Sequence, residues 1–136
     1  MPATAFSQLD KTIQSQINER SSLPKIKSVF ELRINPEEYD PIIGFNSKTD
    51  IIALDLERLP ANIEPEKLKV IKTAKKLNAA RSSKTTLLIY ERSTGSLFLD
   101  ANRRQEGLGA DGGLLAVIEG APSLSQRNIA FISRVL

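Results

Sequence analysis

The fold is constrained most by short runs of branched and aromatic residues that alternate with turn-forming residues. In the clearest case, the runs 85–91 (TTLLIYE) and 96–100 (SLFLD) are joined by residues 92–95, which include a glycine. Such a short connection favours a β-hairpin. Further short runs of this kind occupy residues 26–34, 42–45, 50–56, 114–120 and 129–132. Together they predict a mainly β fold, in which antiparallel strands form a sandwich or a β-roll-like cap.

The N-terminal residues 5–20 follow a different period. Apolar side chains recur there at spacings of three and four, which places them on one stripe of an amphipathic helix: Phe6, Leu9, Ile13 and Ile17. The stripe is a candidate contact face for a protein partner or for self-association, because an apolar stripe left open to water is a liability for a monomer. The alternative is that the stripe packs on the chain's own sheet.

The length of 136 residues fits a single compact domain. Pro24 ends the helical segment, so we divide the chain into an N-terminal helix over residues 1–24 and a single β-rich domain over residues 25–136. Within that domain, residues 64–80 fit two patterns. An apolar residue at nearly every third position favours a helix, whereas residues 67–73 (KLKVIKT) also fit a short strand.

The chain contains no cysteine, histidine or tryptophan. This excludes disulfides, zinc sites built from Cys or His, cysteine nucleophiles and Ser-His-Asp triads, and we expect no enzymatic activity. No run of 18 apolar residues is present, so we expect no transmembrane segment. Residues 1–20 mix Gln, Asp, Lys and Glu where a signal peptide needs an apolar run, so we expect no cleaved signal peptide. The lack of cysteine fits the bacterial cytoplasm and equally fits export without disulfides, and the location stays open.

Charge is distributed unevenly along the chain. Residues 31–66 hold three basic and nine acidic residues (−6), and residues 67–92 hold eight basic and one acidic (+7). The basic block 67–92 is a candidate surface for a polyanion, either nucleic acid or an anionic surface, and its alternative is a solvated face that complements the acidic block. Nucleic acid is not favoured, because residues 67–86 contain no aromatic side chain for base stacking. The candidate polyanion-binding residues are Lys67, Lys69, Lys72, Lys75, Lys76, Arg81 and Lys84.

A glycine-rich segment after residue 99 contains four hard oxygen ligands of the type that calcium binds, namely Asp100, Asn102, Glu106 and Asp111. Their spacing is not that of an EF-hand loop, and Arg103 and Arg104 lie among them. Calcium is the one cofactor that the residues suggest. The alternative is a set of surface-loop carboxylates that hold no metal.

From about residue 42 to residue 132 the chain resembles a known family. Residues 42–54 (IIGFNSKTDIIAL) resemble the pattern I-x-D-F-N-x-x-x-D-x-I-x-L, which closes the calcium-binding repeats of RTX (hemolysin-type) bacterial exported proteins. Residues 88–100 (LIYERSTGSLFLD) and 114–124 (LLAVIEGAPSL) are similar to F-I-Y-N-x-x-T-G-x-L-F-Y-D and V-x-x-A-x-L-x-G-A-P-x-L in the C-terminal, non-repeat region of that family.

The resemblance implies a β-rich capping fold, a strand at Leu68–Thr73 and export by an uncleaved C-terminal signal. It also implies a structural or interaction module, which is our leading expectation; a basic adaptor for a polyanion and a weak calcium-binding domain are the alternatives. The chain departs from the family pattern in three places. The nonapeptide calcium repeats are absent, the family's D-x-D-G is residues 100–103 (DANR), and the aspartate before the last apolar run is Asn128.

Overall fold

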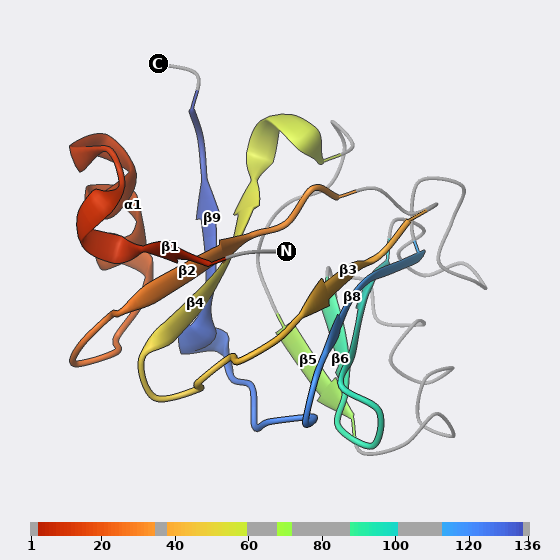
Figure 1. Cartoon of the computed structure of the whole chain (residues 1–136). Coiled ribbons are helices and arrows are strands. Elements are labelled where there is room, and N and C mark those ends of the chain that lie inside the picture. Colours follow the sequence, from red (N-terminus) through yellow and green to blue (C-terminus); the bar gives the residue numbers. More distant parts are fainter. Residues whose placement is uncertain (1–2, 35–37, 60–67, 72–87, 101–112, 135–136) are drawn as a thin grey trace.

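The computed structural model describes residues 3–34, 38–59, 68–71, 88–100 and 113–134 (Figure 1). The mainly β fold with an N-terminal helix is confirmed. The helix is α1 (Lys11–Arg20), and 3-10 turns form η1 (Phe6–Gln8), η2 (Leu56–Arg58) and η4 (Gln126–Asn128). The strands are β1 (Thr4–Ala5), β2 (Ser28–Glu31), β3 (Asp40–Ile42), β4 (Asp50–Asp55), β5 (Leu68–Ile71), β6 (Leu88–Glu91), β7 (Ser96–Leu99), β8 (Gly113–Ile118) and β9 (Ile129–Ile132).

The strands form two sheets, with the orders β1-β2-β4-β9 and β3-β8-β7-β6-β5. The predicted hairpin is confirmed, since β6 and β7 pair antiparallel. The prediction of antiparallel pairing throughout is wrong: β2–β4, β4–β9, β3–β8 and β5–β6 are parallel pairs. For the β2–β4 pair the physical reason is that the chain passes to the other sheet at β3 and then returns, so β2 and β4 run in the same direction.

Strands β3 and β4 illustrate this crossing. Residues 42–45 and 50–56 were predicted to be a strand, a turn and a strand, but β3 begins at Asp40 and the two strands lie in different sheets. The strand alternative for residues 67–73 is confirmed over Leu68–Ile71, where β5 pairs with β6. The adjoining residues 72–80 lie outside the described residues.

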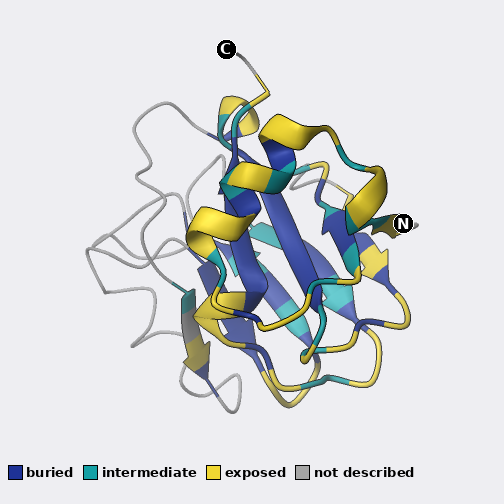
Figure 2. Ribbon diagram, turned by 90° about the vertical axis from the view of Figure 1, so that its left-hand side faces the viewer, coloured by how far each residue is buried: buried dark blue, intermediate teal, exposed yellow. Residues whose placement is uncertain are grey.

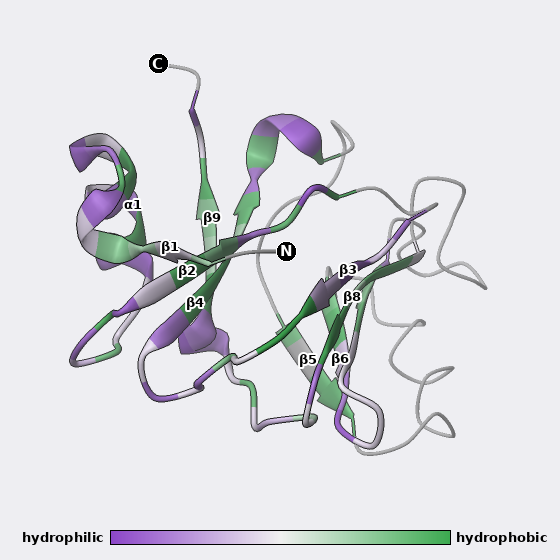
Figure 3. Ribbon diagram, viewed as in Figure 1, coloured by the Kyte–Doolittle hydropathy of each residue, from purple (hydrophilic) through white to green (hydrophobic). Residues whose placement is uncertain are grey.

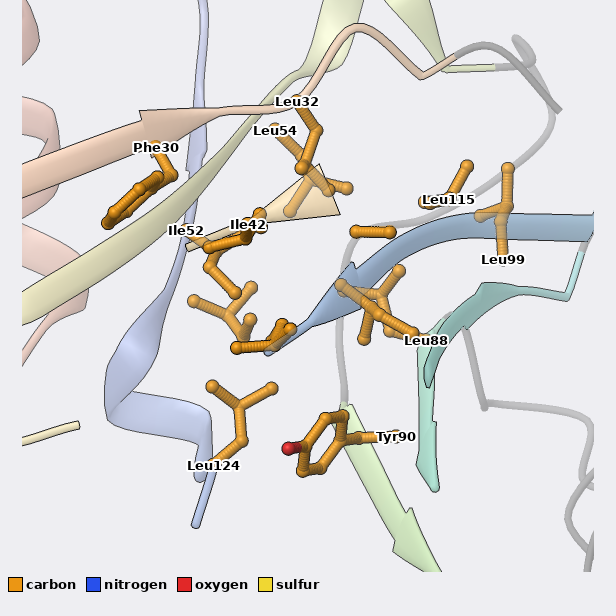
Figure 4. Packing of buried hydrophobic residues seen from close by; sticks show 14 of the residues in the cluster. Phe30, Leu32, Ile42, Ile52, Leu54, Leu88, Tyr90, Leu99, Leu115 and Leu124 are labelled. Atoms are coloured by element: carbon orange, nitrogen blue, oxygen red, sulfur yellow. The ribbon is translucent and has the colours of Figure 1, made fainter. Parts of the chain in front are cut away.

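Two apolar layers hold the fold together. One lies between the sheets and includes Phe30, Ile52 and Phe131 from the first sheet and Leu88 and Leu97 from the second (Figure 4). The other face of the first sheet is covered by α1 (Figure 2). Strand β4 has both faces covered, which is why its sequence DIIALD is nearly continuously apolar rather than alternating.

Helix α1 begins later than its apolar period predicts. Asp10 caps it, since its side-chain oxygen accepts a hydrogen bond from the Thr12 backbone N–H at 2.7 Å. Phe6 and Leu9 lie before this cap, so the predicted helix over residues 5–20 is corrected to Lys11–Arg20. Ile13 and Ile17 are buried against the sheet, and Phe6 and Leu9 pack on the same cluster. The structure therefore shows the apolar stripe packed on the chain's own sheet.

Candidate functional site

The structure describes few of the site residues that the sequence predicts. Of the calcium candidates, Asp100 is 1% exposed and directly follows β7, whereas Asn102, Glu106 and Asp111 lie outside the described residues. In the part of the chain that is described, no group of three His, Cys, Asp or Glu side chains is placed to hold a metal ion. Of the polyanion candidates, Lys69 lies in β5. The others lie outside the described residues: Lys67, Lys72, Lys75, Lys76, Arg81 and Lys84.

A different group of basic residues meets at one end of the molecule. Strands β2, β4 and β9 are parallel neighbours, so they begin at the same end of their sheet (Figure 1). A basic residue stands just before each of them: Lys27 before β2, Lys48 before β4 and Arg127 before β9. All three side chains are exposed. Neighbouring strands are about 4.8 Å apart, so three basic residues precede three adjacent strands, in a row that follows the sheet order β2-β4-β9.

Hydrogen bonds between the loops fix the backbone of this row. The Lys27 N–H donates to the Thr49 carbonyl at 2.7 Å, which joins the loop before β2 to the loop before β4. The Asn128 side-chain amide donates to the Ser47 carbonyl at 2.8 Å, which joins the loops before β4 and β9. The Ser21 hydroxyl donates to the Arg127 carbonyl at 2.8 Å, which joins the C-terminal end of α1 to the loop before β9. The three loops therefore form one connected surface.

Three further cations extend this surface. We define the basic end as Arg20, Lys25, Lys27, Lys48, Arg92 and Arg127. Figure 3 shows hydrophilic stretches in the loops before β2 and β4. Arg92 belongs to it through the hairpin turn, since its guanidinium donates to the Ser123 hydroxyl at 3.4 Å. Among the described residues the ion pairs are Arg33–Asp40 and Arg134–Glu31, both elsewhere, so no ion pair is found within this group.

Acidic residues reduce the charge of the basic end only in part. Among the described residues, its exposed acids are Glu19 and Glu119. Asp50 and Glu91 are buried and are used inside their own turns. Asp50 accepts hydrogen bonds from the Asn46 N–H and the Thr49 hydroxyl, both at 2.9 Å. Glu91 accepts from the Ser93 and Thr94 hydroxyls. The exposed surface of this end is thus predominantly cationic.

Residues of the segments that resemble the RTX pattern have structural roles in this part of the molecule, and so does Asn128, where the chain departs from that pattern. Asn46 and Asp50 close the turn before β4, and Asn128 joins that turn to β9. Tyr90 donates from its hydroxyl to the Pro122 carbonyl at 2.6 Å and so joins β6 to the turn after β8. None of these contacts involves a metal ligand set, and together they hold the loops of the basic end on the sandwich.

Removing the Tyr90 hydroxyl tests one of these contacts. We expect Tyr90→Phe to lower the free energy of unfolding by about 1–2 kcal/mol, because the Pro122 carbonyl loses its donor. Burial raises the pKa of Tyr90 above its ordinary value of 10.0, with Arg92 acting in the opposite direction. This group therefore contributes stability that is fully present below pH 10 and falls as pH rises through the raised pKa. Urea unfolding at pH 7 and pH 10.5 should show that alkaline loss in the native chain and a smaller loss in the variant.

A small cavity lies beside α1, away from the basic end. It has a volume of about 30 Å³ and is lined by apolar side chains of α1 and the first sheet, with Glu31 and Arg134 at its rim. Those two residues form a bidentate ion pair, with N–O distances of 2.9 and 3.0 Å. The volume accommodates water rather than an organic substrate.

The chain was compared with protein-family models, with curated proteins and with solved structures, and no match was found in any of the three. None of the helices that the structure describes is long and apolar enough to span a membrane.

Proposed function

We propose that this chain is a non-enzymatic interaction module with a β-rich capping fold, and that it binds a polyanionic partner through the basic end. The observation that carries the proposal is the row of Lys27, Lys48 and Arg127 before three adjacent parallel strands. Clustered cations of this kind attract polyanions over a distance of about one Debye length. The attraction weakens as salt is added. The binding site proposed here is therefore the basic end rather than the block 67–92, most of which lies outside the described residues.

Two features of the fold support an interaction role over self-association through the helix. The apolar stripe of α1 is covered by the chain's own sheet, so it offers little surface to a second copy. The buried polar groups Asp50, Glu91 and Asn128 are hydrogen-bonded within the loops, which keeps those loops in place before a partner binds. From the resemblance to the RTX C-terminal region we take only the β-rich capping fold that it implies.

A soluble polyanion tests the proposal without a lipid surface. We expect the chain to be retained on heparin at low salt and to elute as salt is raised. The double variant Lys27→Glu and Lys48→Glu should bind heparin at least about 30-fold more weakly, because each reversal removes an attraction of about 1 kcal/mol and adds a repulsion.

The matched control reverses two exposed cations that are not part of the basic end. Lys11 begins α1 and Arg58 lies in η2 after β4, so Lys11→Glu with Arg58→Glu makes the same change in net charge away from the basic end. We expect this control to keep most of the heparin retention. Equal loss in both double variants would mean that net charge alone explains the binding, and failure of the native chain to bind heparin or any other polyanion would refute the proposed function.

A further inference from the structure

An exposed aliphatic side chain lies in the same loop as Lys48. Ile43 directly follows β3 and is 65% exposed, which is the largest exposure among the large apolar side chains of the described residues. Gly44 comes next, with a φ of +80°, and Phe45 beyond it is buried between the sheets. The loop therefore turns at Gly44, anchors itself through Phe45 and leaves Ile43 in solvent.

Ile43 and the basic end together have the chemistry of a surface that binds lipid headgroups. Cations near an anionic bilayer each contribute about 1 kcal/mol of attraction, and an aliphatic side chain gains by burial at the boundary between headgroups and acyl chains. A nucleic acid would gain nothing from Ile43. A single-stranded nucleic acid would instead use exposed aromatic rings for base stacking, and the aromatic ring of this loop, Phe45, is buried.

We propose that the partner of the basic end is the surface of an anionic lipid bilayer, with Ile43 inserted among the headgroups. This inference rests on the proposed function above and adds the class of partner to it. Lys27, Lys48 and Arg127 would contact lipid phosphates and carboxylates, while Ile43 supplies the contact that a soluble polyanion lacks. Binding would be peripheral and reversible, because one aliphatic side chain buries too little area for permanent insertion.

The test uses the full chain with vesicles of phosphatidylcholine, with vesicles of phosphatidylcholine and phosphatidylserine in about a 7:3 ratio, and with a duplex DNA of about 20 base pairs. We expect sedimentation with the phosphatidylserine vesicles at low salt, with release as salt is raised, and none with phosphatidylcholine alone. Lys27→Glu with Lys48→Glu should weaken vesicle binding at least about 30-fold.

Ile43→Ser separates a bilayer from other polyanions. It should weaken binding to phosphatidylserine vesicles about tenfold while heparin retention stays unchanged, because heparin has no apolar interior. Tyr39→Ser is the matched control, since Tyr39 is 49% exposed and precedes β3 at the other end of this strand. We expect the control to change neither measurement.

Three results would overturn the bilayer as partner while leaving the proposed function intact. They are heparin retention without vesicle binding, vesicle binding that Ile43→Ser does not weaken, and tighter binding to the duplex DNA than to phosphatidylserine vesicles at equal salt. Failure to bind heparin, vesicles and DNA alike would instead refute both proposals. Circular dichroism of each variant shows that a loss of binding is not a loss of folding.

Discussion

Gly95→Ala is expected to lower the free energy of unfolding by about 3–5 kcal/mol, a large share of the total stability of a domain of this size. Gly95 lies in the hairpin turn between β6 and β7 with a φ of +75°, which L side chains rarely adopt. A Cβ atom there would lie 2.3 Å from the Ile118 carbonyl oxygen and 3.2 Å from the Ala121 Cα. Both neighbours are backbone, so relief requires the turn after β8 to move. The Ile118 N–H, which donates to the Gly95 carbonyl at 2.8 Å, would move with it.

Gly44→Ala and Gly120→Ala are the matched controls. Both residues have a positive φ, +80° and +83°, but an added Cβ would meet nothing within 4 Å at either position. Each should therefore cost only the conformational penalty of about 1–2 kcal/mol. Urea unfolding of the three variants separates the close contact from the backbone conformation. Equal losses at all three glycines would mean that the approach of the hairpin to the turn after β8 adds nothing to stability.

The hairpin was readable from the sequence because its pairing is local. Strands β6 and β7 are joined by four residues, and Leu88 pairs with Leu99 across a short loop. The strand Ser28–Glu31 was also readable from alternation, with Val29 on the helix side and Phe30 in the layer between the sheets. The start of α1 was missed because apolar spacing continues through Phe6 and Leu9, while the cap at Asp10 decides where the helix begins.

The basic end was missed because its residues come together only through parallel pairing. Lys27, Lys48 and Arg127 are spread over 101 positions, and a count of charge by blocks places them in three different segments. What they share is that each stands one or two residues before a segment that forms a strand. This feature brings the three residues to the same end of the sheet only if their strands are parallel neighbours. Local sequence patterns do not predict the order of strands in a sheet.

A second residue that local patterns could not explain is Asn128, which stands where the resembled family has an aspartate. It is 1% exposed. Its side-chain nitrogen donates to the Ser47 carbonyl at 2.8 Å and to the Asp50 carbonyl at 3.1 Å, and its side-chain oxygen accepts from the Ser125 N–H. The amide thus supplies donors and an acceptor at once, and an ionised carboxylate supplies only acceptors.

Asn128→Asp is therefore expected to cost about 3–5 kcal/mol at pH 7, because a buried carboxylate would face two carbonyl oxygens without a donor. The fold should raise the pKa of the introduced carboxyl above its unfolded value of about 3.9. The loss is then smallest well below a pH of about 3.9, where the carboxyl is protonated in both states, and fully developed above the raised pKa. Urea unfolding at pH 7 and pH 4 should show this difference.

Asn18→Asp on the exposed face of α1 makes the same chemical change and should cost under about 0.5 kcal/mol. A loss for Asn128→Asp that is the same at both pH values would show that the amide donors, rather than a buried charge, account for it.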